Sequence, residues 1–199
     1  MKGNYLLMTG APGSRWSGVA NNIWKSFDID QSDYSPERTY SHNKTRLHSG
    51  AYFDPMMEFE FEVSNWDKPF DNKGLLESFL SASQGVRLIK SHTLATQLEN
   101  YKKYPIIMVY RNDYECWEWW NECGGFDIPY PKYDWYKNQD NMFLQIQRQN
   151  QDIMTFIYKN RDRVTRCSSN LEVLDLLGLD KSVDLDDYAS KDVSVYVYL

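Results

Sequence analysis

The first 27 residues carry the pattern that most constrains how this chain folds. An apolar run at residues 5–8 leads into a glycine-rich turn at residues 10–14, and apolar side chains then recur at helical spacing over residues 17–27. Glycines let a backbone turn with positive φ, and the N–H groups at the start of a helix favour a negatively charged ligand. The pattern predicts a strand, a phosphate-binding loop and a helix, so we expect the chain to bind a phosphorylated nucleotide.

Charge and cysteine content argue against several classes of protein. The 199-residue chain has a formal net charge of −6 and a sequence pI near 5.1, whereas surfaces that bind nucleic acid are basic. Cys116, Cys123 and Cys167 are an odd number without metal-type pairing, which is typical of reduced thiols. No stretch approaches the roughly 20 apolar residues of a membrane span. We therefore expect a soluble, cytoplasmic protein that binds neither nucleic acid nor membrane.

Strand and helix patterns alternate along the rest of the chain. Further strands are predicted at residues 57–63, 86–92 and 105–110, and further helices at 74–83, 93–101, 112–120, 141–161 and 171–177. Residues 28–56 are polar and turn-rich, and we interpret residues 28–72 as an irregular insertion in a single domain spanning residues 1–199. The alternation predicts an α/β fold of the three-layer P-loop type, with a mainly parallel central sheet flanked by helices.

Residues with useful chemistry follow three of the predicted strands. They are the loop at residues 10–17, the segment from Lys90 to His92, and Arg111. Ligands of parallel α/β sheets bind beyond the carboxyl ends of the strands. We therefore expect these residues to lie at one edge of the sheet.

The N-terminal loop departs from the loop that binds nucleoside triphosphates, GxxxxGK[ST]. Read from Gly10, Ser17 fits that pattern, but Arg15 replaces the second glycine and Trp16 replaces the lysine. Arg15 is then the expected cation of the loop. The alternative is a tight strand-to-helix turn that holds no ligand.

Two later segments resemble a known family. Residues 87–92, Arg-Leu-Ile-Lys-Ser-His, resemble the R-x-x-K-T-H segment of cytosolic sulfotransferases, and residues 106–112 resemble their I-I-Y-x-x-R-N strand. The N-terminal loop resembles the family's 5′-phosphosulfate loop, and residues 170–179 resemble its C-terminal helix. The resemblance implies transfer of a sulfuryl group from 3′-phosphoadenosine 5′-phosphosulfate (PAPS) to an acceptor hydroxyl or amine, with no metal.

The resemblance also implies roles for individual residues. His92 is the expected general base, while Lys90 and Arg15 stabilise charge on the transferring group. Arg111 offers a planar guanidinium to the cofactor's 3′-phosphate, and Trp119 occupies the place of a 3′-phosphate serine. The residues expected to hold the 5′ end are Gly10, Pro12, Gly13, Ser14, Arg15, Trp16, Ser17 and Gly18.

Departures from the family pattern leave alternatives open. The family's loop lysine is missing where Ala11 stands, and the residue at Trp119 has no hydroxyl. The chain could then be a divergent sulfotransferase, a P-loop kinase using Mg-ATP, or a non-catalytic binding protein.

The acceptor side is hardly specified by the sequence. Candidate acceptor-pocket residues are Tyr40, His42, His48, Tyr52, Phe53, Trp117, Trp119, Trp120, Phe126, Tyr130 and Tyr133. The competing interpretation of Trp117 and Trp120 is a buried helix face combined with a contact between copies in a homo-oligomer.

Overall fold

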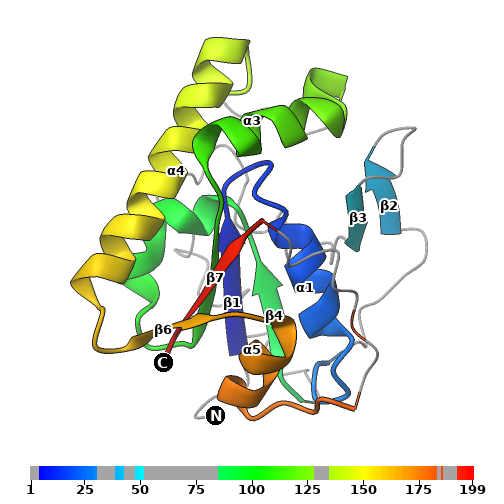
Figure 1. The fold of residues 1–199 in the computed structure, drawn as a ribbon, viewed down its shortest axis with the longest axis vertical. Helices are drawn as coiled ribbons and strands as arrows, with labels where there is room; N and C mark the ends of the chain where they lie inside the picture. The colour runs from blue at the N-terminus through cyan, green and yellow to red at the C-terminus, as the bar shows by residue number, and fades with distance from the viewer. Residues whose placement is uncertain are drawn as a thin grey trace, which may run out of the picture.

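A five-stranded sheet with helices on both faces forms the centre of the molecule (Figure 1). The computed structural model describes residues 5–30, 39–42, 48–51, 85–127, 135–182, 185 and 192–199. In order across the sheet, the strands are β4 (Arg87–Lys90), β1 (Tyr5–Gly10), β5 (Ile106–Tyr110), β7 (Ser194–Tyr198) and β6 (Val164–Cys167). The expected α/β architecture is confirmed.

The sheet is mixed rather than mainly parallel. β1 pairs in parallel with β4 on one side and β5 on the other, with Met8 opposite Lys90 and Leu7 opposite Ile106. β7 runs antiparallel to both β5 and β6. Neither β6 nor β7 was predicted. β6 lies at an edge and exposes Thr165 and Arg166, so its residues show no apolar run.

Helices cover the two faces of the sheet. One face carries α1 (Trp16–Trp24) and α5 (Asn170–Leu177), and the other carries the 3₁₀ helix η3 (Thr93–Tyr101) and the long α4 (Gln139–Lys159). Helix α3 (Asp113–Glu122) and the short η4 (Gly125–Asp127) lie beyond the carboxyl ends of the parallel strands, at the top of Figure 1. No helix in the described ranges has the length and apolarity to cross a bilayer.

Alternation along β1 divides the core into two layers. Leu6 and Met8 pack with α1 residues such as Ile23, whereas Leu7 packs with Ile153 and other residues of η3 and α4. Successive strand residues point to opposite faces, so a strand buried on both sides must be apolar throughout. This requirement explains the uninterrupted apolar run at the start of the chain.

Helix boundaries follow local capping chemistry. Asn112 accepts a hydrogen bond from the Tyr114 amide at the start of α3, and Ser91 Oγ accepts from the amides of Thr93 and Leu94 at the start of η3. The Ser91 hydroxyl thus satisfies two backbone amides at the start of η3. Helix α5 ends at Gly178, whose φ of 67° favours glycine.

The interval 28–72 contains a described hairpin. Strands β2 (Thr39–His42) and β3 (His48–Ala51) pair antiparallel, with His42 opposite His48, and β3 lies against α1 (Figure 1). Ile29 also forms a parallel bridge with Val86. The strand predicted at 57–63 and the helix predicted at 74–83 lie outside the described residues.

Candidate anion-binding site at the carboxyl edge of the sheet

Two residues of the loop between β1 and α1 have left-handed backbone conformations. Gly13 has a φ of 79° and Arg15 a φ of 63°. Arg15 occupies the position of the second glycine in the triphosphate loop, and it keeps the backbone conformation for which glycine is usual there. The Ser14 amide closes the turn by donating to the Ala11 carbonyl at 3.0 Å. The loop therefore retains a glycine-type turn with a cationic side chain at the start of α1.

Close packing fixes this loop in place. A Cβ atom on Gly13 would lie 1.9 Å from the carbonyl oxygen of Cys116, so only glycine allows the loop to approach α3 this closely. A Cβ atom on Gly10 would lie 2.6 Å from both Ser14 Oγ and Trp16 Cβ. Both glycines are needed for backbone approach, and Gly13 also for its positive φ.

The remaining loop residues point mostly into the protein. Trp16 is 6% exposed and belongs to the apolar layer beneath α1, so its ring does not replace the missing lysine. Ser14 is fully buried, and its Oγ has no hydrogen-bond partner. Pro12 and Ser17 are buried and Gly18 is half-buried. Ser14 Oγ is thus a polar atom of the loop that a ligand could satisfy.

Arg15 and Trp119 form a stacked pair. The guanidinium carbon of Arg15 lies 4.1 Å from the centre of the Trp119 ring, and Trp119 is 8% exposed. A guanidinium over an indole face is stabilised by about 0.5–2 kcal/mol. Trp119 therefore offers no hydroxyl where the family pattern has one, and it supports the cation of the loop instead.

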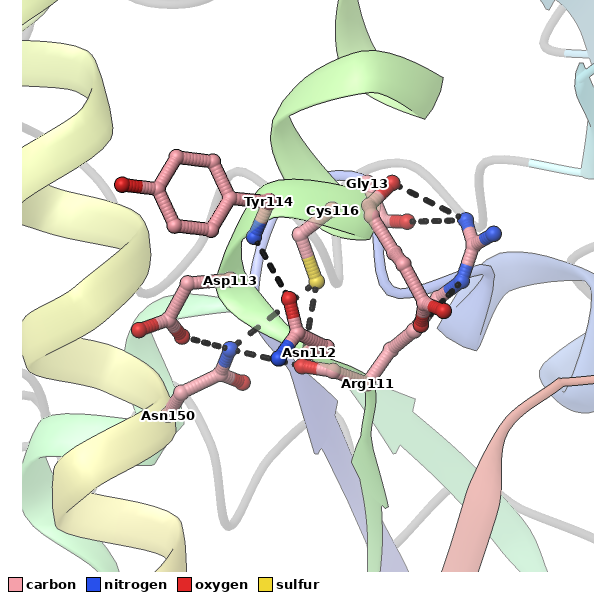
Figure 2. Close-up of polar contacts among 8 residues, drawn as sticks. Gly13, Arg111, Asn112, Asp113, Tyr114, Cys116 and Asn150 are labelled. Carbon is pink, nitrogen blue, oxygen red and sulfur yellow. Dashed lines mark hydrogen bonds and ion pairs between the residues drawn. The ribbon is translucent and has the colours of Figure 1, made fainter.

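Arg111 ties the end of β5 to the loop. Its Nη1 donates to the carbonyls of Glu115 at 3.1 Å and Gly13 at 3.5 Å, and its Nε lies 3.6 Å from a carboxylate oxygen of Glu115 (Figure 2). Its side chain is only 10% exposed. The prediction of Arg111 at this edge agrees with its position, but the guanidinium is already bonded to protein groups.

Asn150 of α4 braces the same turn. Its Nδ2 donates to Asp113 Oδ1 at 2.7 Å and to the Arg111 carbonyl at 2.9 Å (Figure 2). These bonds connect α4 to the junction between β5 and α3. Sequence reasoning assigned Asn150 no role.

Lys90 is a buried amine at the end of β4. It is 1% exposed, and burial lowers its pKa from 10.5 to about 7. It lies opposite Met8 in register, and alternation along β4 places it on the face of Leu88, toward the layer of α1. A negatively charged ligand beside this amine would favour its protonated form.

His92 lies under α4. Its Nδ1 is 3.2 Å from Nε2 of Gln149, and its ring meets the Trp135 ring edge-on with 5.7 Å between centroids. It is 2% exposed, and burial lowers its pKa to about 3 against a smaller opposing effect of the Gln149 contact. The imidazole is neutral at pH 7 and is a weaker base than the sequence suggested.

The structure separates Lys90 from His92 more than expected. The strand predicted over residues 86–92 would place both on one face, but β4 ends at Lys90 and the backbone at His92 is helical, with φ −73° and ψ −25°. Alternation therefore stops before His92. Its side chain packs against α4, whereas Lys90 faces the layer of α1.

Three polar residues of α4 complete this edge of the sheet. Gln145, Gln149 and Asn150 are buried between apolar residues at either end of the helix. Each also has one polar atom without a hydrogen-bond partner: Gln145 Nε2, Gln149 Oε1 and Asn150 Oδ1. The sequence signal that could have identified them is a polar residue at a helix position where the periodicity predicts a buried side chain.

The aromatic residues at the candidate acceptor side differ in how deeply they are buried. Trp120 is 1% exposed and stacks on Trp117 at 5.1 Å between centroids, which agrees with the interpretation of a buried helix face. Phe126 packs edge-on against Trp120 and is 41% exposed. For Tyr40, His42 and His48 only the strand positions are described, and Tyr52, Phe53, Tyr130 and Tyr133 lie outside the described residues.

A cavity of about 570 Å³ lies at the opposite end of the sheet. Lys102, Lys103 and Arg163 contribute to its lining. It is a second cationic region, distant from the loop. Within the described ranges, no group of three or more His, Cys, Asp or Glu side chains is arranged to hold a metal ion.

Comparisons with known protein families, curated proteins and solved structures give no significant match to this chain. The function of the site must therefore be argued from its own residues and geometry.

Proposed function

We propose that the chain binds PAPS at the carboxyl edge of β4, β1 and β5 and transfers its sulfuryl group to an acceptor hydroxyl or amine. The observation that carries the proposal is the loop at residues 10–18. It has two residues with left-handed backbone conformations before a helix start and carries Arg15. It also adjoins strands that end at Lys90 and at Tyr110, next to Arg111. Backbone amides at a helix start and nearby cations are what a phosphosulfate group requires.

The residues of the loop suit the 5′ end of the cofactor. Ser14 Oγ is buried without a partner, and burial of an unpaired hydroxyl costs about 1–3 kcal/mol that a bound oxyanion would offset. Arg15 is held over Trp119, so its cation is positioned before a ligand arrives. Burial raises the pKa of Cys123, at the end of α3, to about 11, while the charges of Arg15 and Arg111 lower it, so both guanidinium groups lie near this thiol.

The fit to a 3′-phosphate is poorer. Arg111 gives its Nη1 hydrogens to the carbonyls of Gly13 and Glu115. Trp119 cannot accept a hydrogen bond. The 5′ group held by the loop is therefore the main anchor, and Arg111 acts first by holding the loop against α3.

The chemistry needs a proton acceptor and a donor that stabilises developing charge. PAPS would supply an activated sulfuryl group, whose bond to the 5′-phosphate breaks as the acceptor's oxygen or nitrogen bonds to sulfur. Two basic side chains lie at the end of β4, His92 and Lys90. We expect one of the two to take the acceptor's proton and the other to stabilise charge on the sulfuryl oxygens.

Thermal unfolding with matched nucleotides tests the proposal. We would measure Tm with 3′-phosphoadenosine 5′-phosphate, the product nucleotide, and with ATP in the presence and absence of Mg²⁺. Ligand at 100 times its Kd adds about 2.7 kcal/mol, which raises Tm by roughly 5–11 °C in a domain of this size. We expect this rise in Tm with the bisphosphate and not with ATP, whether or not Mg²⁺ is present.

Variants at the two cationic regions provide the control. Arg15→Gly should abolish the rise in Tm without changing the loop, because glycine readily adopts the φ of 63° found at Arg15. Lys103→Met, in the distant cavity, should leave it unchanged. Stabilisation only by Mg-ATP would indicate a kinase and overturn the proposal. No stabilisation by any nucleotide would also contradict it and favour a binding protein of another kind.

A further inference from the structure

The contact between His92 and Gln149 specifies where the imidazole carries its proton. Gln149 Nε2 lies 3.2 Å from His92 Nδ1. An amide nitrogen has hydrogens to donate and no free lone pair, so Nδ1 must be the acceptor and carry no proton. A neutral imidazole has one N–H, which is then on Nε2.

The reverse orientation of the amide is less favourable. Gln149 is fully buried, and as placed only its Oε1 lacks a partner. Rotating the amide would bring Oε1 to Nδ1 and leave an NH₂ group, with two hydrogens, unpaired in the interior. Buried N–H groups without partners are rarer than under-satisfied carbonyl oxygens. The observed orientation of the amide is therefore the one that leaves fewer hydrogen-bonding groups unpaired.

The surroundings of His92 keep the ring neutral. Trp135 covers it edge-on, and the facing polar group on α4 is the uncharged Gln149. Burial disfavours the imidazolium and lowers the pKa to about 3. The ring thus presents a neutral N–H, which is a hydrogen-bond donor rather than a proton acceptor.

We propose that Gln149 holds His92 as the Nε2–H tautomer, so that His92 donates to an oxygen of the bound anion and Lys90 takes the acceptor's proton. The exchange of roles rests on the proposed function, whereas the tautomer does not. The basic side chains at this edge that are at least partly buried include His92, Lys90, Arg15 and Arg111, whereas Lys137, two residues from Trp135, is exposed. Arginines do not lose their protons in proteins, so Lys90 is what remains once His92 is a donor.

Lys90 has the properties of a proton acceptor. In the unliganded protein, burial brings the pKa of Lys90 to about 7, so part of the amine is unprotonated at neutral pH. As the acceptor's oxygen bonds to sulfur and the bond from sulfur to the phosphate oxygen breaks, the acceptor's proton passes to Nζ. The amine becomes an ammonium ion, and the phosphate keeps the electron pair of the broken bond. The bonds, the proton and the electron pair of this step are all accounted for without a metal ion or a further reactant.

Nitrogen NMR of the unliganded protein tests the tautomer directly. In protein labelled with ¹⁵N-histidine, the proposal expects the pyrrole-type resonance of His92 at Nε2 and the pyridine-type resonance at Nδ1, with His92→Gln identifying the signals. Gln149→Glu should reverse the pattern, since an ionised carboxylate can only accept. Gln151→Glu, on the exposed side of α4, should not. A pyrrole-type Nδ1 in the wild type would overturn the proposal.

Matched substitutions test the exchange of roles. His92→Gln keeps an N–H donor, so transfer from PAPS to 2-phenylethanol or 2-phenylethylamine should stay within about tenfold of wild type; loss of a true base costs about 10²–10⁴-fold. Lys90→Arg keeps the charge but cannot accept a proton, so transfer should fall by about 10²-fold or more while the rise in Tm with the bisphosphate remains. The opposite pattern, an active Lys90→Arg and an inactive His92→Gln, would contradict the exchange.

Failure of the proposed function remains distinguishable from failure of this inference. If no nucleotide raises Tm but His92 carries its proton on Nε2, the tautomer assignment is supported and the PAPS proposal is overturned. If the bisphosphate raises Tm and His92 carries its proton on Nδ1, the PAPS proposal is supported and the tautomer assignment is overturned.

Discussion

The helices on the two faces of the sheet differ in how their buried amide side chains are bonded. Helix α1 packs Val19, Ala20 and Ile23 against the sheet, and Nδ2 of its buried Asn22 donates to the Gly18 carbonyl within the helix. Helix α4 buries Gln145, Gln149 and Asn150, and each has one polar atom without a hydrogen-bond partner. Apolar burial stabilises a fold, whereas buried amides with unpaired atoms cost about 1–3 kcal/mol each. We infer from this difference that α1 mainly packs against the sheet and that the buried amides of α4 serve the proposed site.

The largest change in the free energy of unfolding is expected at Lys90, which faces the layer of α1. Its pKa is about 7 in the folded protein and 10.5 in the unfolded chain, so between these values the unfolded chain binds more protons and stability rises with pH. The free energy of unfolding of wild type should therefore increase from pH 7 to pH 10 relative to Lys90→Met, by an amount on the order of 4 kcal/mol.

Urea unfolding of both proteins at several pH values measures this difference. Taking the difference between wild type and Lys90→Met removes contributions from other titrating groups. A difference that stays constant with pH would show that the Lys90 amine keeps its ordinary pKa, and would remove it as a proton acceptor.

A pair of substitutions compares the two helix faces directly. Ile23→Ala in α1 removes buried methyl groups and should lower the free energy of unfolding by about 2–5 kcal/mol. Gln149→Leu in α4 loses one hydrogen bond but also removes an unpaired buried oxygen, so its stability should stay within about 1 kcal/mol of wild type. Chemical denaturation checks both. A loss at Gln149 as large as that at Ile23 would mean that the amide is structural.

The smallest change in stability is expected at Arg15. Arg15→Gly removes the stacking of the guanidinium on Trp119 but also relieves a left-handed backbone, and each effect is about 1 kcal/mol. The two should nearly cancel, so Tm without ligand should change by only a few degrees. A large drop in Tm would show that Arg15 holds the loop together rather than serving a ligand.

The sequence predicted the parts of the fold that depend on local pattern. The glycine-rich turn and the continuous apolar run of β5 both act within a few residues of their position. The strands β6 and β7 could not be predicted in the same way. β7 pairs with β5 and β6 across long separations in sequence, and pairing partners are not written in local periodicity.

The candidate site was predicted only in part for the same reason. Motif spacing placed Lys90, Arg111 and the loop at one edge of the sheet. It could not supply the contact that defines His92, because Gln149 is 57 residues away. Nor could it show that Arg111 bonds to the carbonyl of Gly13, since a carbonyl is present at every residue. Tertiary contacts decide what each site residue can do.

Titration of ¹⁵N-labelled protein with 3′-phosphoadenosine 5′-phosphate tests the central claim most directly. We expect saturable shifts of the backbone amides of residues 12–18 and of His92, with no change around Lys102, Lys103 and Arg163 at the opposite end of the sheet. Shifts confined to that distant cavity, or no shifts at concentrations up to the millimolar range, would contradict an anion-binding site at the carboxyl edge.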